Sequence, residues 1–147
     1  MKKGLKILIG IFVICAVSVF VVTTVKTNKE KGEREQKYAD AYTQKFNLKK
    51  EYEDMESRYE SLEKAYECIQ EACSTYGKNT LARRQTAYVY YSNGGGSKLD
   101  YMDFDSSSRI INTRDVIAEE LLELKLAMSQ NKTKQVEYDV IMKQNKD

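Results

Sequence analysis

A run of heptads between residues 38 and 76 is the strongest pattern in the sequence. Apolar and aromatic residues recur there at alternating spacings of three and four, which places them on one face of a helix. The twelve positions are Tyr38, Ala41, Lys45, Leu48, Tyr52, Met55, Tyr59, Leu62, Tyr66, Ile69, Cys73 and Tyr76, and Lys45 alone among them is charged. The pattern predicts a long helix that buries this face against a second helix.

A second, shorter helix is predicted over residues 112–143. It begins where Asn112 or Thr113 can cap the first turn, and Asp115 then lies at the N-terminal end, where the helix dipole favours an acid. Its core face consists of Ile117, Leu121, Leu124 and Met128. The polar residues 131–135 interrupt this face, so we expect the helix to bend or fray there.

Residues 77–111, between the two helices, are rich in residues that favour turns. Gly94, Gly95 and Gly96 form a flexible turn in the middle of this region. A short helix over 81–91 is one interpretation of this region, and a β-hairpin tip is the other, because the segments 88–91 and 98–104 have a strand-like composition. Four tyrosines form the candidate partner-binding tip: Tyr88, Tyr90, Tyr91 and Tyr101.

Together these elements predict a mainly α-helical body spanning residues 38–147. The helices at 38–76 and 112–143 each have one apolar face, and an antiparallel hairpin would let one chain supply both faces. A parallel coiled coil of two chains is the alternative. The expected interface residues are Leu48, Tyr52, Met55, Tyr59, Leu62, Tyr66 and Ile69 on the first helix and Ile117, Leu121, Leu124 and Met128 on the second.

Residues 7–25 carry no charge and are predicted to form a transmembrane anchor. At about 1.5 Å per residue, the 19 residues of this segment cover roughly the 30 Å hydrocarbon core of a bilayer. The segment is longer than the apolar core of a cleaved signal peptide and does not end in small residues, so we expect it to be retained. A basic tail, residues 1–6, precedes it, and a charged juxtamembrane linker, residues 26–37, follows it.

The basic residues that flank the anchor bear on its orientation. The lysines before it, Lys2, Lys3 and Lys6, resemble the flank of a signal anchor and predict an extracytoplasmic body. The basic residues after it are more numerous, and their number alone would favour a cytoplasmic body. The opening Met-Lys-Lys-Gly also resembles the short basic leader of type IV pilin-like proteins, which implies a fibre subunit as an alternative. Ile9 departs from that family, because it stands where an acidic residue is expected.

The composition excludes several classes of function. The chain of 147 residues has a net charge of +2 and contains no histidine, so it holds no histidine-dependent catalytic set and no imidazole metal site. It has 24 basic and 22 acidic residues, a balance that gives no excess of positive charge for nucleic acid. We therefore expect no enzymatic activity, no cofactor and no nucleic-acid partner.

Two polar segments match ligand-binding motifs only in part. Residues 94–98 combine glycines with a lysine but lack the spacing of a phosphate-binding loop. Asp103 and Asp105 match the first ligands of an EF-hand, but Arg114 stands where the bidentate glutamate is needed. We expect no specific metal at this segment.

The layout predicts a single-pass membrane protein whose helical body is a scaffold or interaction module. Its expected partners are the lipid bilayer and either another protein or a second copy of the chain, bound through the coiled coil. In layout alone it resembles membrane-anchored coiled-coil proteins of bacterial division complexes and phage lysis spanins. The alternative is a ligand-sensing ectodomain in which residues 86–104 form the recognition surface.

Overall fold

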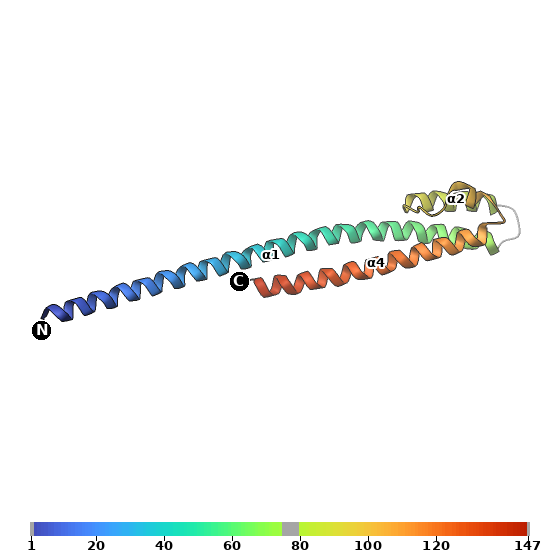
Figure 1. The fold of residues 1–147 in the computed structure, drawn as a ribbon. Helices are drawn as coiled ribbons and strands as arrows, with labels where there is room; N and C mark the ends of the chain where they lie inside the picture. The colour runs from blue at the N-terminus through green and yellow to red at the C-terminus, as the bar shows by residue number, and fades with distance from the viewer. Residues whose placement is uncertain (1, 75–79, 147) are drawn as a thin grey trace. The chain divides into compact units, whose positions relative to one another are not determined.

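The computed structural model describes the backbone of residues 2–74 and 80–146 and the side chains of residues 18, 20–74 and 80–146. Within these ranges it consists of four α-helices and has no strand (Figure 1). The helices are α1 (Lys2–Ser74), α2 (Thr80–Asn93), α3 (Tyr101–Asp105) and α4 (Ile110–Asn145). The prediction of a mainly α-helical chain is confirmed.

The chain divides into two compact units. The first consists of Met1–Gln44 with Tyr138–Asp147, and the second consists of Lys45–Glu137. In the first unit, Ala41 is buried and Tyr38 lines a shallow groove with Glu35 and Asn145. The second unit contains α2, α3 and most of the buried side chains.

Within the second unit, the segments of α1 and α4 run in opposite directions (Figure 1). The ammonium of Lys132 lies 4.8 Å from the centre of the Tyr52 ring, whereas Ile69 shares a core with Ile117. A residue later in α1 therefore packs against a residue earlier in α4. The core they share consists of Leu62, Ala65, Ile69, Ala87, Tyr91, Phe104, Ile117 and Leu124.

The heptad positions of α1 face inward. Those between residues 38 and 73 are all buried or half-buried, while Tyr76 lies outside the described residues. Residues 26–37, expected as a linker, belong to α1 and are exposed, and the ion pair of Lys31 with Glu35, at 3.9 Å, joins two adjacent turns of that segment. The buried side chains of α1 thus recur with the helical period that the sequence predicts, and the charged side chains of residues 26–37 are exposed.

The expected fraying at residues 131–135 was wrong, because α4 continues through them to Asn145. Asn131 is buried, and its side-chain oxygen accepts a hydrogen bond of 2.7 Å from the Gln135 amide on the next turn. These two polar residues continue the alternating spacing begun by Ile117, whereas Val136 is exposed. The seam of α4 therefore changes from apolar to polar while keeping its period.

Of the two interpretations of the region between the long helices, the short helix is confirmed and the β-hairpin was wrong. Residues 88–91 belong to α2, and residues 98–104 form a turn followed by α3. Ala87 and Tyr91 are both buried and lie four residues apart, a spacing that puts both side chains on one helix face. Packing of that face against α1 and α4 outweighs the strand-like composition of the segment.

The expected membrane anchor falls only partly within the described side chains. Residues 7–17 and 19 lie outside them, and Phe20, Val21, Val22 and Val25 are exposed on α1. No helix in the part of the chain that the structure describes has an apolar stretch sufficient to cross a bilayer.

Candidate functional site

Tyr91 is a core residue rather than a surface residue. Its side chain is 1% exposed, and its hydroxyl donates a hydrogen bond of 2.8 Å to Oε1 of Glu120 on α4. The phenolic oxygen of Tyr91 also accepts hydrogen bonds from the backbone N–H groups of Lys98 and Leu99, at 2.9 and 3.1 Å. One phenol therefore ties α2 to α4 and to the turn that precedes α3.

The environment of the Tyr91 hydroxyl favours its protonated form. Burial raises the pKa of Tyr91 from 10.0 to about 12, and the hydrogen bond to the Glu120 carboxylate contributes in the same direction. The two backbone N–H donors oppose this shift, because they stabilise the phenolate. The hydroxyl acts as a structural donor at neutral pH, and nothing in its surroundings prepares it for proton transfer there.

The glycine turn is shaped by close packing. Gly94 lies against α1, where Nε of Arg58 donates a hydrogen bond of 3.2 Å to its carbonyl oxygen, and an added Cβ would lie 2.9 Å from Cγ of Leu62. Gly95 has a φ of 67°, which favours glycine. Gly96 lies against the Tyr91 ring, with no room for a Cβ. The three glycines let the chain cross between helices.

The other candidate tyrosines differ in exposure. Tyr88 is half-buried and packs edge-on against Tyr101 and Phe104, with ring centres 5.3 and 5.4 Å away. Tyr90 is half-buried, and the ammonium of Lys64 lies 5.9 Å from its ring centre. Tyr101 is exposed and accepts a hydrogen bond of 3.3 Å from the Gln85 amide. The four therefore do not form one exposed aromatic platform.

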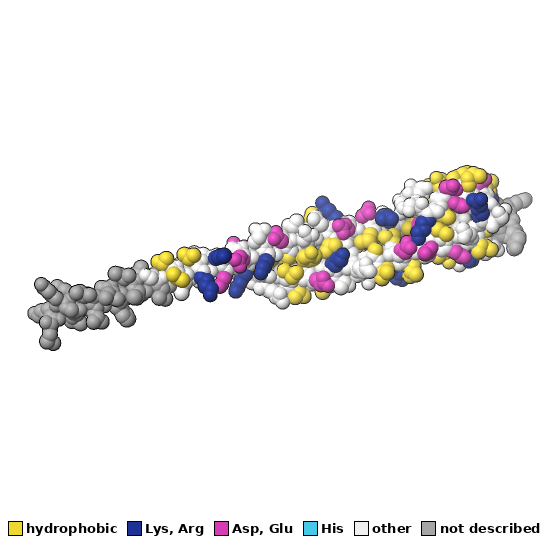
Figure 2. Space-filling model, in the orientation of Figure 1, with side chains coloured by type: hydrophobic (Ala, Val, Ile, Leu, Met, Phe, Trp, Pro, Cys, Tyr) yellow, Lys and Arg dark blue, Asp and Glu magenta, His cyan; other side chains and the backbone are white. Residues whose placement is uncertain are grey.

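Exposed apolar side chains gather on α2 and α3 instead. Leu81 and Val89 on α2, with Tyr101 and Met102 on α3, are 41–62% exposed, and we call these four residues the tip surface. The contact between the Tyr88 and Tyr101 rings joins the two helices. Figure 2 shows hydrophobic side chains over α2, with charged side chains beside them. Such grouped exposure is typical of contact surfaces.

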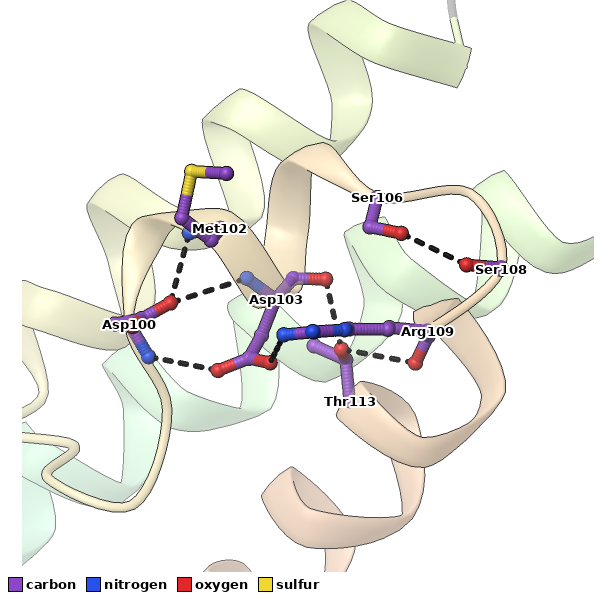
Figure 3. A network of polar contacts seen from close by, with 7 residues as sticks. All are labelled: Asp100, Met102, Asp103, Ser106, Ser108, Arg109 and Thr113. Atoms are coloured by element: carbon purple, nitrogen blue, oxygen red, sulfur yellow. Dashed lines mark hydrogen bonds and ion pairs between the residues drawn. The ribbon is translucent and has the colours of Figure 1, made fainter.

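The acidic segment near α3 forms helix caps (Figure 3). Asp100 accepts hydrogen bonds from the backbone of Met102 and Asp103, and the Asp103 carboxylate accepts one from the backbone of Asp100. Arg109 pairs with Asp103 at 3.1 Å. The backbone hydrogen bond from Asp100, followed by this arginine, lowers the pKa of Asp103.

The same network connects α3 to α4. Thr113, expected as a helix cap, is fully buried within the first turn of α4, and its hydroxyl reaches the carbonyl oxygens of Asp103 and Arg109 at 3.0 and 3.1 Å (Figure 3). The carbonyl oxygen of Asp105 accepts a hydrogen bond from the guanidinium of Arg84. Among the described residues, no three acidic or cysteine side chains are grouped as a metal site would require.

The predicted interface residues lie between α1 and α4. Tyr52 and Tyr59 with Met128 and Lys132 line an open groove of about 380 Å³. Leu62, Ile69, Ile117 and Leu124 are buried in the core. The hydrogen bond to Tyr52 raises the pKa of Lys132. Leu48, Met55, Tyr66 and Leu121 are half-buried. The tyrosine rings pack at the edge of the seam with their hydroxyls near water.

Cys68 and Cys73 are free, half-buried thiols. Burial raises the pKa of Cys68, and the nearby Arg83 opposes that shift only in part. A raised pKa reduces the thiolate fraction at neutral pH. Cys68 thus lacks the electrostatic environment of a reactive nucleophile.

Sequence reasoning missed Phe104, Glu120 and Met102. Phe104 is a single aromatic residue in an acidic segment, and Glu120 is one of many acids on α4, so neither differs from its neighbours in the sequence. Their positions depend on how α3 and α4 approach Tyr91. The chain matches no known protein family, no curated protein and no solved structure.

Proposed function

We propose that the protein is a single-pass, membrane-anchored interaction protein that binds a protein partner through the tip surface. Residues 7–25 are the anchor, and the body lies on the extracytoplasmic side. The proposed role is to recruit or position that partner at the membrane, without catalysis.

The tip surface is the observation that carries this proposal. Leu81, Val89, Tyr101 and Met102 expose apolar area, although Tyr91 on α2 and Phe104 on α3 are buried in the core. Exposing apolar side chains costs about 25 cal/mol per Å² relative to burial, so grouped exposure on a packed support favours a contact with another surface. Its position on two short helices joined by an aromatic contact gives it a defined shape.

The anchor is supported by the sequence. The segment 7–25 is uncharged, whereas the remainder of the chain mixes both signs of charge, and lysines stand on both sides of it. A segment of this length can satisfy all its backbone hydrogen bonds within one helix, as the bilayer interior requires.

Photo-crosslinking at the tip surface tests the proposed partner contact. We expect a benzophenone side chain at Val89 or Met102, introduced into the full chain in intact cells, to give one discrete heterologous adduct. The same group at Glu60, an exposed position on α1, serves as the matched control and should give none. Leu81→Asp should abolish the Val89 adduct, because it places a charge in the apolar contact. Equal labelling from all three sites would contradict the proposal.

Fractionation tests the anchor separately. We expect the full chain to sediment with membranes and to resist alkaline carbonate extraction, since residues 7–25 would lie in the hydrocarbon core. A variant with Ile11 and Val17 both replaced by lysine should appear in the supernatant, because each charge costs about 3 kcal/mol at the centre of a span. Replacing Lys29 and Lys31 by serine is the matched control. Release of the unmodified chain by carbonate would refute the anchor.

A further inference from the structure

The side of α4 that faces away from the core has a second apolar stripe. Its members are Ile111, Leu122, Leu126 and Val136, which we call the outer stripe, and each is 59–70% exposed. At about 100° per residue, these four positions fall within about 80° of one another around the helix axis. The remaining positions on this arc are Asp115, Ala118, Ser129 and Thr133, of which only Asp115 is charged.

The outer stripe repeats with the spacing of a packing seam. From Ile111 to Val136, the positions on this arc are separated by three or four residues throughout, as in a helix that contacts another helix. The inward seam, which includes Ile117 and Leu124, lies about 140° away around the axis and is already covered by α1. One helix thus has two seams, and only one of them is buried in the single chain.

The two edges of the outer stripe carry opposite charges. Arg114, Lys125 and Lys132 lie along one edge, and Glu119 and Glu137 lie along the other. When two copies of a helix pair in parallel, one edge of each helix meets the opposite edge of its partner. A residue on the first edge then lies opposite the residue five positions later on the partner helix. Antiparallel pairing instead brings like edges together.

The spacing of the charges fits the parallel arrangement. Glu119 is the fifth residue after Arg114, and Glu137 is the fifth after Lys132. Parallel pairing would therefore place a base opposite an acid at both positions, twice each by symmetry. In the single chain these groups have only exposed contacts, such as Arg114 with Asp115 at 2.7 Å and Lys132 over the Tyr52 ring. Such contacts are weak and easily exchanged.

We propose that the outer stripe is a dimerisation surface on which a second copy of this chain docks its own outer stripe in parallel. The surface is separate from the tip surface, so the inference does not rest on the proposed partner contact. A bilayer is a poorer occupant, because the acidic edge would face anionic headgroups. A self-complementary charge pattern is what two-fold pairing of identical surfaces requires.

Cysteine crosslinking distinguishes the orientations. In the full chain with Cys15, Cys68 and Cys73 replaced by alanine, we expect both Leu122→Cys and Val136→Cys to form disulfide-linked homodimers, since parallel pairing brings each residue close to its own copy. Ser57→Cys, exposed on α1, is the matched control and should remain monomeric. A thermal melt of each variant verifies that its fold is retained.

Charge reversal tests the register. Glu137→Lys alone should lower the yield of the Leu122→Cys dimer about fivefold to tenfold, because two attractive pairs become repulsive. Adding Lys132→Glu to the same chain should restore the yield, since the pairs are re-formed with exchanged signs. If Glu137→Lys merely destabilised the fold, a second substitution at Lys132 would not restore the dimer yield. Restoration would therefore identify a specific charge pair.

Three results would overturn the dimer. One is a yield at Leu122→Cys no higher than at Ser57→Cys, and a second is failure of Lys132→Glu to rescue Glu137→Lys. The third is crosslinking of Leu122→Cys only to Val136→Cys in a mixed sample, which would indicate antiparallel pairing. Loss of the tip-surface adduct leaves all three measurements unaffected, so the two proposals can fail independently.

Discussion

Replacing Tyr91 with alanine is expected to lower the free energy of unfolding by about 3–5 kcal/mol, the range for deleting a buried aromatic side chain. The substitution removes a ring that is 1% exposed and leaves Glu120 and the backbone N–H groups of Lys98 and Leu99 without their shared partner. Small domains are stable by only about 5–15 kcal/mol, so this loss is a large fraction of the total. Urea denaturation of the full chain in mild detergent, followed by circular dichroism, measures it.

Tyr101→Ala is the matched control, because the same residue type lies on the surface of the same unit. Its ring is exposed, lies edge-to-face with Tyr88 and accepts one surface hydrogen bond from Gln85, so we expect a loss of about 1 kcal/mol or less. Equal losses for the two variants would contradict the assignment of Tyr91 to the core.

Tyr91→Phe separates the hydroxyl from the ring. Because the folded state raises the pKa of Tyr91 from 10.0 to about 12, it holds the proton more tightly than the unfolded chain does. The resulting stabilisation is complete below pH 10 and is lost as the pH rises through about 12. Between pH 10 and about 12, the melting temperature should therefore fall less steeply with pH for Tyr91→Phe than for the unmodified chain. Parallel slopes would mean that other groups cause the alkaline instability.

The repeated pattern of α1 is the part of the fold that the sequence determines most directly. Positions such as Leu62 and Ile69 recur with the helical period over many turns, so their shared face can be inferred without knowing the partner helix. The polar end of the α4 seam was misjudged because Asn131 and Gln135 look like surface residues. Their burial follows from the register of an already formed helix rather than from their own chemistry.

The region between α1 and α4 could not be predicted in the same way. Tyr88, Val89, Tyr90 and Tyr91 favour a strand by composition, and no period longer than a few residues contradicts that preference. The helix arises because Ala87 and Tyr91 meet a core built by Leu62, Phe104 and Ile117, which are distant in sequence. Such contacts distinguish the buried Tyr91 from the exposed Tyr101, although the two look alike in the sequence.

Gly96→Ala is expected to destabilise the second unit by about 1–3 kcal/mol, the usual cost of overpacking a core. The added Cβ would overlap the ring of Tyr91, which is held by its hydrogen bond to Glu120 and by the Phe104 ring 5.3 Å away. The ring cannot move aside without breaking these contacts. The cost therefore arises from overlap between the added Cβ and the Tyr91 ring. Urea denaturation of the full chain measures the loss.

Gly32→Ala is the matched control and should act in the opposite direction. Gly32 lies on the exposed part of α1 with nothing within 4 Å of an added Cβ, so alanine is expected to stabilise that helix by up to about 1 kcal/mol through its higher helix propensity. A stabilising effect at both positions would show that the Gly96 turn can relax away from Tyr91. Opposite signs would show that the ring and its partners fix the path of the chain between α2 and α3.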